Sequence, residues 1–157
     1  MKRYISARQY NLDAAFSEDS FTRAKYAEHT KNSELQEIYM YDPSWIVRSS
    51  LADNPDISKD VMKVLATDDY LQVLFCLLEN PNITSDTLDI MADSTNIAVH
   101  AEMLSHCVKL ISTDTLIKMY KKLPTDLSSI HRFDLKKYVT NLKTTLRRRG
   151  VNYEEIH

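Results

Sequence analysis

The sequence repeats itself at an interval of 26 residues. The segment NPDISKDVMKVLATDDYLQVLFCLLE (residues 54–79) is followed directly by NPNITSDTLDIMADSTNIAVHAEMLS (residues 80–105). In register, the two segments share their Asn-Pro opening and several apolar positions: Ile57 with Ile83, Ala66 with Ala92, and Val73 with Val99. A fixed period of this length is typical of stacked helical units, each of which is too small to bury its own apolar face.

The start of a helix is predicted at the same place in each unit. The predicted N-cap residues are Asn32, Ser58, Thr84 and Ser112, whose side chains can accept a hydrogen bond from an unpaired N–H. An acidic residue follows two positions later in all four units, where the helix dipole favours negative charge. An isoleucine before three of the caps matches an apolar residue five positions on, which is the spacing of a hydrophobic staple.

Each unit is expected to contain two helices. The pattern predicts a first helix from Ser58 to Ala66 and a second from Tyr70 to Glu79. The second helices are predicted to end at Asn-Pro pairs, at 54–55 and 80–81, with the asparagine in the left-handed conformation. The array is predicted to cover residues 10–123, about four and a half units.

The composition favours an all-α protein. The chain has 157 residues, one glycine and four prolines, so it offers few of the signals that join strands. Hydrophobic residues make up 43%, which is enough for a packed core in a single domain spanning residues 1–157. The chain lacks an apolar run of about 18 residues and an N-terminal apolar signal segment, so we expect a cytoplasmic protein without a membrane partner.

The segment DPSWIVRSSLADNPDISKDVMKVLATDD, which spans residues 42–69, resembles a leucine-rich-repeat-variant unit, a short two-helix relative of HEAT repeats. Asp42, Val47 and Arg48 are similar to the Asp…Val-Arg signature of HEAT repeats. The resemblance implies an α-solenoid of about four to five HEAT-like repeats, with the Asp-Arg pairs forming a polar ladder between units. Several repeats depart from the signature, so the implied ladder is incomplete: Leu74 and His100 replace the arginine, and Ser17 and Ser94 replace the aspartate.

A longer amphipathic helix is predicted over residues 127–150, followed by a tail at 151–157. Its apolar face is expected to cover the open end of the array as a terminal cap. The helix also carries a basic group, which either complements the helix dipole or contacts the phosphates of a nucleic acid. The possible phosphate contacts are Lys136, Lys137, Lys143, Arg147, Arg148 and Arg149.

Charge is divided unevenly along the chain. Residues 1–117 hold 10 Lys and Arg against 18 Asp and Glu, whereas residues 118–157 hold 10 against 4. An acidic body argues against a long nucleic-acid track and favours a basic partner, because opposite charge accelerates association.

The sequence offers little for catalysis. With Gly150 as its single glycine, it contains no phosphate-binding loop and no dinucleotide fingerprint. Cys76 and Cys107 are interpreted as reduced core cysteines. The one cluster of possible metal ligands is His100, Glu102, His106 and Cys107, which lacks the Pro-Cys-x-x-Cys partner of zinc deaminases. We therefore predict no catalytic residue, no cofactor and no metal, with a metal-dependent enzyme as the least favoured alternative.

The remaining candidate is the surface of the second helices, which line the concave side in HEAT-like arrays. Phe75 is a large aromatic side chain among small and acidic neighbours, and it is either an interface anchor or ordinary core. The sequence therefore favours a non-enzymatic protein-protein interaction module, an adaptor, scaffold or inhibitor-type protein, with nucleic-acid binding as the alternative. The predicted partner-binding residues are Ile46, Ser49, Asp53, Gln72, Phe75, Glu79 and Glu102.

Overall fold

A computed structural model describes residues 15–123 and 133–156 of the chain. Within these residues the regular secondary structure is helical and no strand is present, which confirms the predicted all-α class. No helix among the described residues combines the length and the apolar character needed to cross a membrane. The predicted start of the array near residue 10 lies outside the described residues, as does part of the predicted helix over 127–150.

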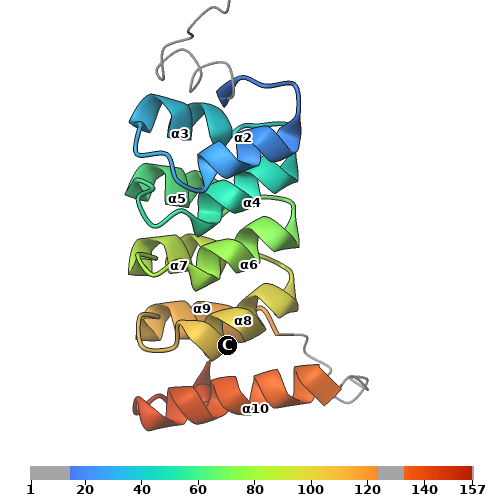
Figure 1. Ribbon diagram of the computed structural model, residues 1–157. Coiled ribbons are helices and arrows are strands. Elements are labelled where there is room, and N and C mark those ends of the chain that lie inside the picture. Colours follow the sequence, from blue (N-terminus) through green and yellow to red (C-terminus); the bar gives the residue numbers. More distant parts are fainter. Residues whose placement is uncertain (1–14, 124–132, 157) are drawn as a thin grey trace, which may run out of the picture. The chain divides into compact units, whose positions relative to one another are not determined.

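The chain divides into two compact units, residues 1–82 and 83–157. In unit 1, α2, α4 and α6 lie side by side, with α3 and α5 beside them (Figure 1). The described helices of unit 1 are α2 (Ser20–Ala27), α3 (Ser33–Tyr39), α4 (Trp45–Asp53), α5 (Lys59–Leu65) and α6 (Leu71–Glu79).

Unit 2 contains the remaining described helices. These are α7 (Ser85–Met91), α8 (Ile97–His106), α9 (Thr113–Lys121), α10 (Phe133–Arg148) and a 3-10 helix η1 (Tyr153–Glu155). Polar side chains tie α9 to α7, since Thr115 Oγ1 donates to Asp89 Oδ1 at 3.0 Å and Lys118 Nζ lies 2.9 Å from Asp93 Oδ2.

The four predicted N-caps are confirmed. The side chain of Asn32 accepts from the Glu34 N–H at 2.9 Å, and Ser58 Oγ accepts from the Val61 N–H at 3.2 Å. Thr84 and Ser112 accept in the same way from N–H groups three residues later. Each cap satisfies donors that a short helix of seven to nine residues would otherwise leave unpaired.

Two arginine-aspartate ion pairs join the N-terminal ends of α2, α4 and α6. Arg23 donates to both carboxylate oxygens of Asp42, at 2.7 and 2.9 Å, and Arg48 makes the same two-point contact with Asp68. Asp42 and Asp68 also accept from the N–H two residues later, which closes the turn before each helix. Ser17 and Ser94 make this same turn contact, so serine keeps the turn where the aspartate is missing.

Buried asparagines join the C-terminal ends of the same helices. Asn54 Nδ2 donates to the carbonyl oxygens of Ala27 and Thr30, and Asn80 Nδ2 donates to those of Ala52 and Asn54. Because the ion pairs join one end and the asparagines join the other, α2, α4 and α6 run in the same direction. The predicted left-handed conformation of these asparagines is wrong, since their φ angles are −67° and −62°. The proline that follows favours this extended conformation.

The core of unit 1 lies between α4 and its neighbours. The buried apolar side chains of α4 and α6 include Val47, Leu51, Ala52, Val73, Leu74 and Leu77. Leu74 occupies the position that arginine holds in α2 and α4, so this repeat replaces an ion-pairing residue by an apolar one.

The described part of α10 packs against α8 and α9, in unit 2. Its buried face consists of Tyr138, Val139, Leu142 and Leu146, so the helix is amphipathic as predicted. The helix ends at Arg148 and is closed by Gly150, whose φ is +78°. The N–H groups of Gly150 and Val151 donate to the carbonyls of Arg147 and Leu146, which is the Schellman arrangement. Only glycine adopts this backbone conformation without a steric penalty.

Candidate functional site

The predicted second-helix surface has a solvent-exposed portion on α4 and α6 in unit 1. Asp53, Gln72 and Glu79 are exposed, while Ile46 and Phe75 are half-buried. Phe75 therefore combines a packed part with an open part, which is compatible with both interpretations of this residue. These five residues define what we call the α4–α6 surface.

Ser49 does not contribute to this surface. Its side chain is 7% exposed, and its hydroxyl donates to the carbonyl of Ile46 at 3.0 Å. The hydroxyl is satisfied within its own helix, which is the usual arrangement for serine in a helix interior. The sequence pattern could not separate Ser49 from its exposed neighbours because small polar residues are compatible with both environments.

Three acidic residues occupy the carboxyl ends of the parallel helices. Glu28 caps α2, Asp53 ends α4 and Glu79 ends α6, and we call these three residues the acidic row. Within residues 15–123, none of them forms an ion pair with a lysine or arginine. Partial removal from water raises the pKa of Asp53, and the carboxylates of Glu79 and Glu28 raise it further. The row thus concentrates negative charge where the helix dipole already disfavours it.

Cys76 lies beside this row in α6 and is 8% exposed. Gln72 Nε2 lies 3.5 Å from its sulfur. Burial raises the pKa of the Cys76 thiol to about 11, and the Asp53 and Glu79 carboxylates also favour the neutral form. Burial likewise raises the pKa of Cys107. Both thiols are thus held in the protonated form, whereas nucleophilic cysteines need a lowered pKa.

Glu102 belongs to α8 in unit 2 and is half-buried. Its carboxylate lies 3.1 Å from Nδ1 of His106 in the same helix, so these two predicted metal-ligand candidates contact each other. His100 is separate from them, being buried at 1% exposure, and burial lowers the pKa of its imidazole. Among the described residues, no group of three or more His, Cys, Asp or Glu side chains is arranged to hold a metal ion.

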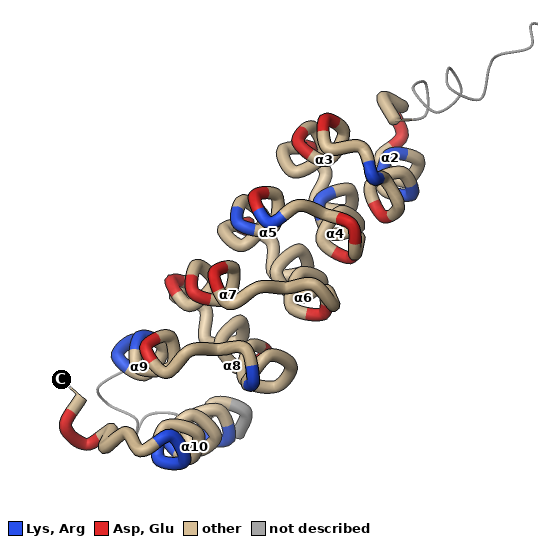
Figure 2. The backbone as a smooth tube through the Cα atoms, turned by 90° about the vertical axis from the view of Figure 1, so that its left-hand side faces the viewer, with Lys and Arg blue, Asp and Glu red and all other residues tan. Residues whose placement is uncertain are grey.

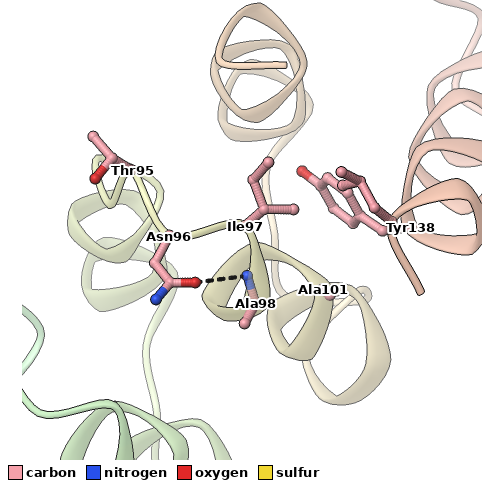
Figure 3. A pocket seen from close by; sticks show the side chains of 7 residues that line it. Thr95, Asn96, Ile97, Ala98, Ala101 and Tyr138 are labelled. Atoms are coloured by element: carbon pink, nitrogen blue, oxygen red, sulfur yellow. Dashed lines mark hydrogen bonds between the residues drawn. The ribbon is translucent and has the colours of Figure 1, made fainter. Parts of the chain in front are cut away.

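His100 packs against Tyr138 of α10, with ring centroids 6.3 Å apart. His100 Nε2 and the Tyr138 hydroxyl are buried, and each lacks a hydrogen-bond partner within the part of the chain that the structure describes. A cleft of about 650 Å³ adjoins Tyr138 between the start of α8 and α10. Figure 3 shows Tyr138 extending from α10 toward Ile97, while Asn96 caps α8 through the Ala98 N–H at 3.0 Å.

The basic residues of α10 and of the segment just after it, drawn blue in Figure 2, differ in their contacts. Lys143, Arg147 and Arg149 make contacts within the protein: the first two lie over the Tyr153 ring, and Arg149 donates to the carbonyls of Ile111 and Val108. The other predicted nucleic-acid contacts are exposed: Lys136, Lys137 and Arg148. Half of the basic group therefore has a structural role in holding α10 and the segment after it.

The sequence interpretation missed two features of unit 1. Glu28 was not assigned to the surface, although it matches Asp53 at a shift of 25 residues. Trp45 and Tyr70 were also not assigned, yet their rings stack with centroids 6.2 Å apart. They occupy different repeat positions, so alignment of the repeats does not bring them together.

No protein-family model matches this chain, and neither a curated protein nor a solved structure matches it.

Proposed function

We propose that this chain is a non-enzymatic protein-interaction module whose α4–α6 surface and acidic row bind a partner protein with a basic surface. In this proposal the helices form a short HEAT-like solenoid of about four to five two-helix repeats, with α10 as its terminal cap. The observation that carries the proposal is the acidic row. Three acidic residues at three parallel helix ends reduce stability, so their presence is best explained by a partner that supplies the opposite charge.

The neighbouring side chains support the same proposal. Ile46 and Phe75 offer half-buried apolar surface on the same two helices, α4 and α6, that carry Asp53 and Glu79. Interfaces commonly combine an apolar anchor with a charged rim. The raised pKa values of both cysteine thiols support binding rather than nucleophilic catalysis.

The test is a comparison of two charge-reversed variants in pull-downs from the source cells, with nuclease added. Asp53→Lys with Glu79→Lys alters the acidic row, whereas Glu37→Lys with Asp60→Lys makes the same change of charge on exposed residues of α3 and α5. We expect the first variant to lose its partner proteins and the second to keep them. Equal capture by both variants would refute the proposal.

Phe75→Ala tests the apolar part of the surface. We expect binding to weaken by about 2 kcal/mol, as for an aromatic anchor. Because Phe75 is half-buried, the cost in folding free energy should stay below the 3–5 kcal/mol typical of a fully buried phenylalanine. Binding should therefore be measured per folded molecule, with the folded fraction determined by circular dichroism.

Nucleic-acid binding is the alternative function, and the exposed Lys136, Lys137 and Arg148 favour it. Changing these three residues to Gln should abolish salt-sensitive RNA or DNA binding if such binding exists. The internal contacts of Lys143, Arg147 and Arg149 make this alternative the weaker one.

A further inference from the structure

Large exposed apolar side chains gather at one edge of unit 1. Of the eight such side chains in the described residues, six lie just before or at the first residues of α2, α4 and α6. We call this group the aromatic edge, and it consists of Phe16, Phe21, Tyr41, Trp45, Tyr70 and Leu71. It lies at the helix ends opposite the acidic row. Clustered exposed apolar residues mark interaction sites more often than scattered ones do.

Trp45 and Tyr70 form the ordered centre of this edge. Their rings are 14° from parallel, and the two side chains remain 39% and 51% exposed. The Arg48 guanidinium lies 5.4 Å from the centre of the Tyr70 ring and is held there by its ion pair with Asp68. Asp68 also accepts from the Tyr70 N–H at 2.9 Å. The two rings are thus positioned before any partner arrives, which reduces the entropy cost of binding.

The net negative charge of unit 1 favours a cationic occupant. Residues 15–82 contain six Lys and Arg against twelve Asp and Glu, and Arg23 and Arg48 are already paired with aspartates. An aromatic face attracts a cation through its negative quadrupole, and the planar guanidinium of arginine also stacks on such a face. The Arg48–Tyr70 contact is an example of that geometry within this protein.

We propose that the stacked Trp45–Tyr70 pair is the anchor for an arginine side chain in an apolar, basic segment of the partner protein. This inference depends on the proposed function, because the acidic row supplies the wider attraction for the same segment. Helices of eight or nine residues separate the edge from the row by about 12–14 Å at 1.5 Å per residue. The segment must therefore present its anchoring arginine and its further basic groups at about that separation.

Trp45 is the single tryptophan of the chain, so its fluorescence reports directly on the anchor. The probe is a synthetic peptide in which arginine alternates with leucine, titrated into the full chain. Two companion peptides carry lysine or glutamate in place of every arginine. We expect a saturable change in Trp45 emission with the arginine peptide. The lysine peptide should bind about fivefold to tenfold more weakly. The glutamate peptide should not change the emission.

The anchor is tested separately with a fluorescein-labelled arginine peptide and the variants Trp45→Ala and Tyr70→Ala. Each should weaken binding about tenfold, as a cation–π contact of 1–2 kcal/mol implies. The control Ile38→Ala removes an apolar side chain that is 47% exposed on α3 and should leave binding unchanged. Circular dichroism melting curves identify any variant that fails to fold, and binding is then compared for the remaining anchor variant.

The outcomes separate this inference from the proposed function. If Asp53→Lys with Glu79→Lys abolishes peptide binding while both anchor variants bind normally, the anchor is wrong and the acidic surface stands. Equal affinity for the arginine and lysine peptides also overturns the anchor. If neither the charge-reversed variant nor the anchor variants change binding, or if the arginine peptide does not bind, both proposals fail.

Discussion

Arg48 and Asp68 form a two-point ion pair between α4 and the turn before α6, across 20 residues of sequence. Their side chains are 14% and 7% exposed, so the pair is largely shielded from water. The same arginine also donates to the carbonyl of Asp42 at 2.6 Å. One side chain thus connects two successive turns of unit 1 and supports the Tyr70 ring.

Arg48→Leu should destabilise the protein by about 2–4 kcal/mol, because it leaves the shielded Asp68 carboxylate without its cation. Asp68→Ser should retain the turn, as Ser94 does at the equivalent position, while removing the charge. The double variant should lose less stability than the two single variants together. Urea denaturation of all four proteins measures this coupling, and strict additivity would show that the pair contributes nothing.

Asn54→Asp should cost about 2–4 kcal/mol of folding free energy. The change removes the two N–H donors that pair with the Ala27 and Thr30 carbonyls, and it turns a buried negative charge toward those oxygens. Asn82→Asp is the matched control, because Asn82 makes its contact with the Pro55 carbonyl at an exposed position. A similar loss in both variants, measured by urea denaturation, would contradict a special role for the buried asparagines.

Neutralising the acidic row should make the protein more stable. Asp53→Asn and Glu79→Gln each remove negative charge from the carboxyl end of a helix, and we expect a gain of about 0.3–1 kcal/mol from each. The raised pKa of Asp53 agrees in sign, because the folded state disfavours its charged form at neutral pH. Thermal melts at low salt provide the measurement. A loss of stability would show that the row is structural and weaken the proposed function.

Stability should fall as the pH decreases below about 6.5 because of His100. Burial lowers the pKa of this imidazole from 6.5, so below that value the unfolded chain binds a proton that the folded chain resists. Above 6.5 both states are neutral and the contribution is constant. Tyr138 packs against the ring, and the positive charge of Lys122 further opposes protonation. Hydrogen bonds with the backbone of Ala92 and Ser94 act in the opposite direction, but burial is the largest cause.

The control for this prediction uses a second histidine. His100→Leu, which copies Leu74 of the preceding repeat, should flatten the pH dependence of urea denaturation between pH 5 and pH 7.5. His106→Gln changes an exposed histidine, and this variant should keep the pH dependence of stability. An unchanged slope in His100→Leu would assign the pH dependence to other groups.

Arg149→Gln should lower stability by about 1–3 kcal/mol, because the guanidinium is the donor for the Ile111 and Val108 carbonyls. Arg148→Gln, one residue earlier and exposed, should change stability by less than about 0.5 kcal/mol. Thermal denaturation of the two variants compares them directly. Equal stability would leave all three consecutive arginines available as an interaction arm.

Local chemistry in the sequence determined the helices of this protein. The cap residues Asn32, Ser58, Thr84 and Ser112 predicted four helix starts because a cap depends on residues within three positions of one another. The resemblance to HEAT repeats implied Asp-Arg pairs between neighbouring units without naming the partners, and the structure shows the pairs Arg23–Asp42 and Arg48–Asp68. The roles of Asn54 and Asn80 were predicted incorrectly, because their partners are carbonyls 24 to 28 residues away.

Only the tertiary structure decided which side chains reach solvent and which meet. Ser49 and Asp53 stand four residues apart on one helix, yet packing against neighbouring helices buries the first and leaves the second open. The stacked Trp45 and Tyr70 belong to different repeat positions, so no periodicity could pair them. Periodicity reports which face of a helix is apolar, whereas burial and stacking depend on the distances between helices, which a single sequence does not contain.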